Sequence, residues 1–93
     1  MVIYKYSLYN PHNSKIKLAI GSKFLSVRIQ GPPYSIPETI VLWFEVDPTT
    51  ELAEERVFQA VNTGMRCPEG LYLGTCESST GIIWHVYERR GKQ

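Results

Sequence analysis

The sequence predicts a mainly β fold, all-β or α+β, with about seven short, mostly antiparallel strands in a curled sheet or small barrel. Two observations support this prediction. Apolar and polar residues alternate through much of the chain, and the alternating runs are short and separated by Gly, Pro, Asn and Ser. A third observation limits the helix content, because only one stretch, near 48–56, favours a short helix. Seven short strands favour closure or strong curling, since both reduce the number of exposed edges.

The first half of the chain predicts four strands. Residues 2–9 alternate, and the period of two is clearest in "KIKLAIG" and "KFLSVRIQ". In the second of these runs we expect Leu25, Val27 and Ile29 to point inward. The run "TIVLWFEV" (39–46) is apolar on both faces, which is typical of a strand covered on each side, so it is expected at the sheet centre.

The second half predicts at most one short helix, followed by further strands. Asp47 is placed as an N-cap and Pro48 at the first helical position, which favours two helical turns within 48–56. "VFQAVN" (57–62) returns to a strand. "LYLGTCE" and "IIWHVYE", joined by Ser78 to Gly81, predict a closing β-hairpin.

Length and composition indicate one compact domain over residues 1–93. No apolar run is long enough to cross a bilayer, and the first residues lack the pattern of a signal peptide, so we expect a cytoplasmic protein that does not contact membranes. The two cysteines, Cys67 and Cys76, are expected to be reduced thiols. Their surroundings have no zinc-ligand spacing, and we expect neither a metal nor another cofactor.

Charge is divided unevenly along the chain. Residues 1–37 carry five Lys and Arg and no acid, whereas residues 38–69 carry seven acids and two Arg. In so small a domain, such segments are expected to attract each other across neighbouring strands.

His85 has the strongest claim of any residue to a chemical role. Alternation places it beside Ile83 and Tyr87 on one face of the last strand. If Glu77 pairs with Ile82, Gly74 lies opposite His85 and leaves room for the ring. We therefore expect a half-buried imidazole that is hydrogen-bonded to a neighbour, and we assign no catalytic residue. The alternative is a thiol site formed by Cys76, His85 and Glu88.

Basic residues of the first three strands suggest a second kind of site. With aromatic rings among them, such a surface could bind single-stranded nucleic acid through phosphate attraction and base stacking. The alternative is an ordinary lysine-rich solvent face. The residues in question are Lys5, Lys15, Lys17 and Arg28, together with Tyr9 and Phe24.

Several short motifs occur in a set order along the chain: "FLSVRIQ", "LWFEVDP", "RVFQAVNTG", "LYLGT" and "WHVYE". In this order and spacing they resemble a family of small, uncharacterised proteins encoded by bacteriophages and prophages. The resemblance covers residues 2–89, although "AVNTG" departs from a "GTG" ending. It implies phage origin, location in the host cytoplasm and a compact sheet domain. It supplies no activity or catalytic residue.

These observations favour a non-enzymatic interaction protein that binds and modulates a host protein or defence complex. Two alternatives stay open, a nucleotide-binding sponge, which requires a homo-oligomer, and a single-stranded nucleic-acid-binding module. The predicted binding residues are Tyr34, Arg56, Arg66 and His85.

Overall fold

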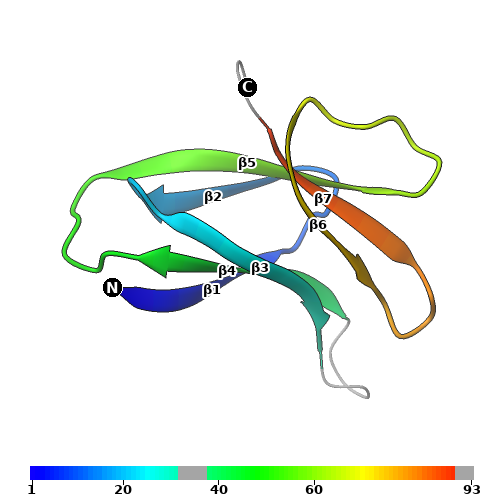
Figure 1. Ribbon diagram of the computed structural model, residues 1–93, viewed down its shortest axis with the longest axis horizontal. Coiled ribbons are helices and arrows are strands. Elements are labelled where there is room, and N and C mark those ends of the chain that lie inside the picture. Colours follow the sequence, from blue (N-terminus) through cyan, green and yellow to red (C-terminus); the bar gives the residue numbers. More distant parts are fainter. Residues whose placement is uncertain (32–37, 90–93) are drawn as a thin grey trace.

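The computed structural model describes residues 1–31 and 38–89, which form strands, turns and loops with no helix. All strand pairs are antiparallel. The predicted fold class, with about seven short antiparallel strands, is therefore confirmed. The strands are β1 (Val2–Leu8), β2 (Ser14–Ala19), β3 (Lys23–Gln30), β4 (Thr39–Val46), β5 (Ala53–Asn62), β6 (Gly70–Glu77) and β7 (Ile83–Arg89) (Figure 1).

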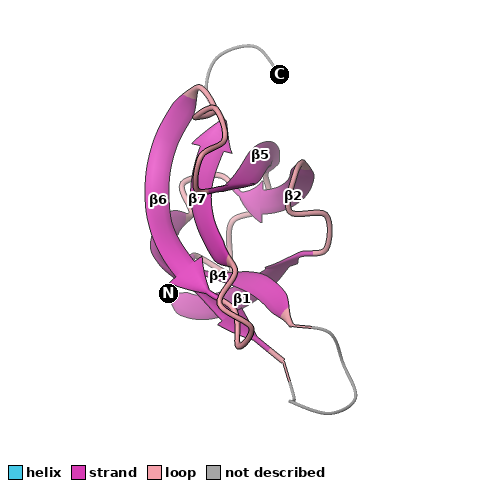
Figure 2. Cartoon of the chain, turned by 90° about the vertical axis from the view of Figure 1, so that its right-hand side faces the viewer, coloured by secondary structure: helices cyan, strands magenta, loops and turns pink. Residues whose placement is uncertain are grey.

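The strands form two sheets that face each other across one core. The three-stranded sheet has the order β1-β4-β3, and the four-stranded sheet has the order β2-β5-β7-β6. Figure 2 shows β6, β7, β5 and β2 following one another in a curved layer, with β4 and β1 below it. No hydrogen-bonded ladder joins the two sheets in the part of the chain described, so the sheets curl without closing a barrel.

Aromatic rings from both sheets meet in the core. The Phe44 ring of β4 contacts the Phe58 ring of β5 edge to face, with the ring centroids 5.9 Å apart. Both residues are fully buried, as is Leu42 beside Phe44 on the same face of β4. Edge-to-face packing of this kind adds to the stabilisation from apolar burial. The prediction that residues 39–46 form a central strand is confirmed for the three-stranded sheet.

A β-bulge in β3 changes which residues face the core. The pairing of β3 with β4 shifts register between Phe24 and Ser26, so Leu25 is the extra residue. Phe24 consequently points inward, and its ring centroid lies 5.8 Å from that of Phe44. Leu25 is 40% exposed. The expectation that Leu25 points inward, with Phe24 among the outward residues, is therefore wrong, whereas Val27 and Ile29 do pack against the core.

The short helix that the sequence allows near 48–56 does not form, which agrees with the expectation of at most one helix. Asp47 accepts hydrogen bonds from the amide and hydroxyl of Thr49, at 3.0 and 2.7 Å, and these bonds close a turn. β5 then begins at Ala53. The residues that would form the second helical turn instead pair with β2 in the antiparallel sheet. A two-turn helix gains too few internal hydrogen bonds to compete with a sheet that is already nucleated.

The predicted closing hairpin is confirmed as β6 and β7, but its register differs from expectation. A second irregularity between Tyr72 and Gly74 shifts the pairing, so Glu77 lies opposite Ile83 and Gly74 lies opposite Val86. The space left by Gly74 is used by the other sheet, because a Cβ atom at this position would lie 2.8 Å from Cγ1 of Val27. Gly74 thus allows β6 and β3 to approach closely, and it does not make room for His85.

Opposite charges lie across from each other at two places in the sheets, as the charge distribution predicts. Lys17 of β2 is opposite Glu55 of β5, and Lys23 of β3 is opposite Glu45 of β4. Such pairs add modestly to the preference for this register.

Candidate functional site

His85 lies on the outer face of the four-stranded sheet, which is the face turned away from the core. Thr75 is directly opposite it on β6, and the Thr75 hydroxyl lies 2.9 Å from the ring Nδ1. The Thr63 hydroxyl lies 2.8 Å from Nε2. The ring is half-buried, so the expected half-buried, hydrogen-bonded imidazole is confirmed.

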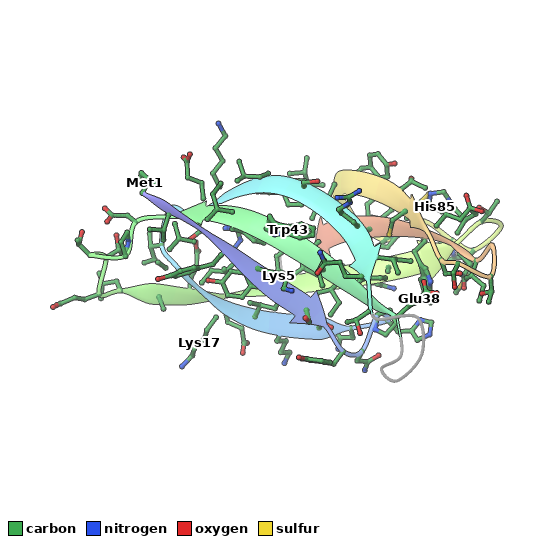
Figure 3. The ribbon with its side chains drawn as sticks, turned by 90° about the horizontal axis from the view of Figure 1, so that it is seen from below. Met1, Lys5, Lys17, Glu38, Trp43 and His85 are labelled. Carbon is green, nitrogen blue, oxygen red and sulfur yellow. The ribbon has the colours of Figure 1, made fainter. Side chains whose placement is uncertain are left out.

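Both ring nitrogens of His85 are engaged by hydroxyl groups, which can donate or accept. Either neutral tautomer can therefore be accommodated. The Thr75 hydroxyl also contacts the phenol oxygen of Tyr72, so a chain of hydrogen bonds runs from β6 through His85 to Thr63. These hydrogen bonds join the start of the β5–β6 loop to the hairpin of β6 and β7. Figure 3 labels His85, which lies at the centre of this hydrogen-bond chain.

Cys76 does not share a face with His85. Cys76 is paired with Trp84, and both pack against the core, whereas His85 and its partner Thr75 point outward. Burial raises the pKa of the Cys76 thiol, which keeps it protonated. The thiol-site hypothesis is therefore wrong in its geometry. Both cysteines are free, as expected, and Cys67 is exposed.

Arg56 and Glu88 form a buried ion pair. Two contacts of 2.7 Å join the guanidinium Nε and Nη2 to the two carboxylate oxygens of Glu88. Nη1 donates to the backbone carbonyl of Ser22 at 2.8 Å. The guanidinium also lies 5.1 Å from the centre of the Phe44 ring. The hydrogen bond with Glu88 is the main cause that raises the pKa of Arg56.

The predicted binding residues are not brought together. Arg56 is directed toward the core and held by Glu88, while His85 points to the outer face of the same sheet. Arg66 is exposed in the loop between β5 and β6. Tyr34 lies outside the described residues.

The basic residues predicted to form one nucleic-acid face lie on two opposite faces. Lys5 is opposite Trp43, and Arg28 is opposite Val41, on the outer face of the three-stranded sheet. Lys15 and Lys17 lie on the outer face of the four-stranded sheet. In Figure 3, the side chain of Lys17 projects away from β2, and Lys5 is labelled on β1. A single continuous strip of these four cations is therefore not formed.

A pocket of about 550 Å³ lies at one end of the two sheets, and we call it the end pocket. Its lining is mainly apolar, a common property of small-ligand sites. Tyr9 is 86% exposed and Ile82 is 49% exposed, so two large side chains are available at its rim. The end pocket is lined by Leu8, Tyr9, Pro11, Ile29, Glu38, Thr39, Ile40, Ser78, Thr80, Ile82 and Trp84.

Among the described residues that line the end pocket, Glu38 provides the only carboxylate. Its two oxygens accept hydrogen bonds from the Ser79 amide, at 3.1 and 3.0 Å, and one also accepts from the Ser79 hydroxyl. These bonds lower the pKa of Glu38, the hydroxyl contact having the larger effect. Figure 3 shows Glu38 at the same end of the molecule as His85. The carboxylate remains exposed and can accept a further hydrogen bond from a ligand.

Two hydroxyls of the end pocket, those of Ser78 and Thr80, serve the turn between β6 and β7. Ser78 Oγ accepts from the Ile82 amide at 3.0 Å and lies 3.0 Å from the Thr80 hydroxyl. On the wall, Trp84 is held by the His12 ring, whose centroid is 5.9 Å away. The described lining therefore combines apolar side chains, an indole wall, several hydroxyl-bearing residues and one carboxylate at the edge.

The end pocket was not predicted from sequence. Its residues come from the ends of strands that are far apart in the chain, and alternation within a strand does not reveal which ends meet. A weak signal was present, since Tyr9 and Ile82 are large apolar residues beside turns.

The whole chain, residues 1–93, matches the family model described as domain of unknown function DUF7352, and the chain belongs to this family. No curated protein and no solved structure matches the chain. In the parts of the chain that the structure describes, no helix is long and apolar enough to span a membrane.

Proposed function

We propose that this chain is a non-enzymatic interaction protein of phage origin that binds and modulates a host protein, and that the end pocket receives an apolar side chain of that partner. The observation that carries this proposal is the combination of a mainly apolar pocket with exposed Tyr9 and Ile82 at its rim. Exposed aromatic and apolar groups around a preformed pocket are typical of binding hot spots.

The charge of the rim favours one type of partner segment. Glu38 is exposed, and its lowered pKa keeps it ionised at neutral pH. A segment with an aromatic or branched apolar residue next to Lys or Arg would place its apolar group in the pocket and its cation near Glu38. Electrostatic complementarity of this kind contributes mainly to the association rate and to specificity.

Two features support binding rather than turnover. The hydroxyls of Ser78 and Thr80 are used within their own turn, and the imidazole of His85 is held by two threonines on the outer face of the sheet. Both ring nitrogens of His85 contact threonine hydroxyls, so neither contacts a carboxylate that would orient the imidazole as a general base.

The test is affinity capture from a lysate of the bacterial host with matched variants. We expect the wild-type protein to enrich one partner, and we expect Ile82→Lys or Tyr9→Ala to lose it. Leu52→Lys is the control, because Leu52 is 71% exposed and does not line the end pocket. Equal capture by wild type and Ile82→Lys would contradict the proposal, as would equal loss with Leu52→Lys.

A further inference from the structure

A second pocket, of about 370 Å³, lies on the outer face of the four-stranded sheet. It extends over β2, β5 and β7, and we call it the basic pocket. Lys15 is directly opposite Val57, which places the lysine and the pocket floor on the same face. The residues that line it are His12, Asn13, Lys15, Val57, Gln59 and Arg89.

The basic pocket contains positive charge that no described residue neutralises. Lys15 and Arg89 form no ion pair within residues 1–31 and 38–89, in contrast to Arg56. The described residues that line the pocket include no carboxylate. By register, the carboxylate of β5 nearest to Val57 on this face is Glu55, and it lies opposite Lys17 instead. An anion could therefore enter without displacing an internal partner.

The guanidinium of Arg89 is only partly satisfied. Nη1 donates to the side-chain oxygen of Gln59 at 3.0 Å. Nε is buried and has no partner among the described residues. Leaving a buried donor of a charged group unpaired is unfavourable, and a ligand with several acceptor oxygens would relieve this cost after a small movement of the side chain.

Aromatic side chains lie directly beside the basic pocket. Gln59 is opposite Tyr87, and Tyr87 is opposite Tyr72. The two tyrosine rings contact each other edge to face, with their centroids 5.4 Å apart, and Tyr72 is 52% exposed. Tyr87 and Arg89 are two residues apart on one face of β7, so their Cα atoms are separated by roughly 7 Å along the strand. An exposed tyrosine ring is a favourable surface for stacking a base.

We propose that the basic pocket binds the phosphate group of a nucleotide through Lys15 and Arg89, and that the base of this nucleotide lies on Tyr72. Phosphate suits the pocket because its oxygens can accept from the guanidinium and the ammonium at once. Neither Lys15 nor Tyr72 lines the end pocket, so this site is independent of the proposed protein-binding function.

The test is isothermal titration calorimetry of the full chain with adenosine and uridine monophosphates, inorganic phosphate and unphosphorylated adenosine. We expect the mononucleotides to bind and adenosine not to bind. Lys15→Gln and Arg89→Gln should each weaken nucleotide binding by roughly tenfold or more, which is the loss expected for one charge-assisted contact. Tyr72→Ala should reduce the affinity for the mononucleotides to that for inorganic phosphate.

Lys17→Gln is the matched control, because Lys17 is the next outward lysine of β2 and does not line the basic pocket. Its binding should equal that of the wild type. Three results would overturn the proposal. These are no binding of any mononucleotide up to about 10 mM, an equal loss with Lys17→Gln, and inorganic phosphate binding as tightly as the mononucleotides with no effect of Tyr72→Ala. Circular dichroism of each variant establishes that a loss is not due to unfolding.

Discussion

The guanidinium of Arg56 and the carboxylate of Glu88 form a two-point ion pair that joins β5 to β7, with both contacts at 2.7 Å. The side chains are 16% and 11% exposed, so the pair is largely removed from water. We predict that Glu88→Ala lowers the free energy of unfolding by about 3 kcal/mol, because it leaves the Arg56 cation buried without a counter-ion. Urea denaturation monitored by tryptophan fluorescence measures this change.

The same relationship makes a prediction for the double variant. Arg56→Met with Glu88→Leu removes both charges, and it should cost less than Glu88→Ala alone even though the Ser22 carbonyl loses its donor. Glu55→Ala is the control, because Glu55 is an exposed carboxylate of the same sheet. This substitution should change the free energy of unfolding by less than about 0.5 kcal/mol. A Glu88→Ala variant as stable as Glu55→Ala would show that the ion pair does not stabilise the fold.

Gly74 is predicted to be required for the packing of β6 against β3. A Cβ atom at this position would lie 2.8 Å from Cγ1 of Val27, a methyl group of the opposite sheet. Gly74→Ala should therefore destabilise the protein by about 1–3 kcal/mol, as overpacking generally does. Thermal and urea denaturation measure the effect.

A double-mutant cycle with Val27 distinguishes this steric cause from a backbone effect. In a Val27→Ala background, the methyl group introduced by Gly74→Ala has space, so the substitution should be close to neutral there. If Gly74→Ala costs the same free energy in both backgrounds, the close approach of the two sheets is not the reason for the glycine.

Alternation predicted the strands well, but it could not locate the irregularities within them. Strands such as β4 carry enough apolar residues to be recognised from sequence alone. The bulge at Leu25 leaves no compositional mark, and after one extra residue the inward and outward positions exchange. The short helix that the sequence allows near 48–56 does not form for a related reason, since local capping signals do not include the ladder that β5 makes with β2.

The sites were harder to predict than the strands. Alternation says which residues of one strand share a face, but it does not say to which sheet the strand belongs. Because β2 joins the four-stranded sheet, Lys15 and Lys17 are separated from Lys5 and Arg28. The two pockets depend on contacts between strand ends and on register across three strands, and neither is encoded in a short window of sequence.

Because Phe24 faces the core and Leu25 does not, the two residues are predicted to differ in their sensitivity to substitution. Phe24→Ala removes a ring that packs on Phe44 and should cost about 3 kcal/mol of unfolding free energy. Leu25→Ser changes a side chain that is 40% exposed and should cost less than about 1 kcal/mol. Chemical denaturation of the two variants side by side is the measurement. The reverse order would mean that the bulge is absent in solution.

The two thiols are predicted to differ in reactivity. Cys67 is exposed, whereas Cys76 is half-buried and its pKa is raised by burial. Since the thiolate is the reactive form, iodoacetamide should modify Cys76 at least about tenfold more slowly than Cys67 in the folded protein. Mass spectrometry of the single-thiol variants Cys67→Ser and Cys76→Ser gives the two rates. In urea the rates should become similar, and a fast reaction of Cys76 in the native state would contradict its position in the core.

Glu38 is predicted to make the turn between β6 and β7 sensitive to acid. The pKa of Glu38 is lowered because Ser79 donates to its carboxylate from the hydroxyl and the amide. A carboxyl group with a lowered pKa stabilises the folded state above its ordinary value, near 4.3, and this contribution is lost as the pH falls through the lower pKa of the folded state. The stability difference between wild type and Glu38→Gln should therefore be constant above about pH 6 and shrink in acid.

The Ser79 amide resonance reports this change directly. In the wild type its chemical shift should follow the protonation of Glu38, with a midpoint below the ordinary value for glutamate. Glu38→Gln should abolish that step, and Glu54→Gln, an exposed acid on β5, should leave it unchanged. A Ser79 titration that persists in Glu38→Gln would show that another group controls the turn. The carboxylate at the edge of the end pocket would then be free of Ser79, and it would protonate near the ordinary value of an exposed glutamate.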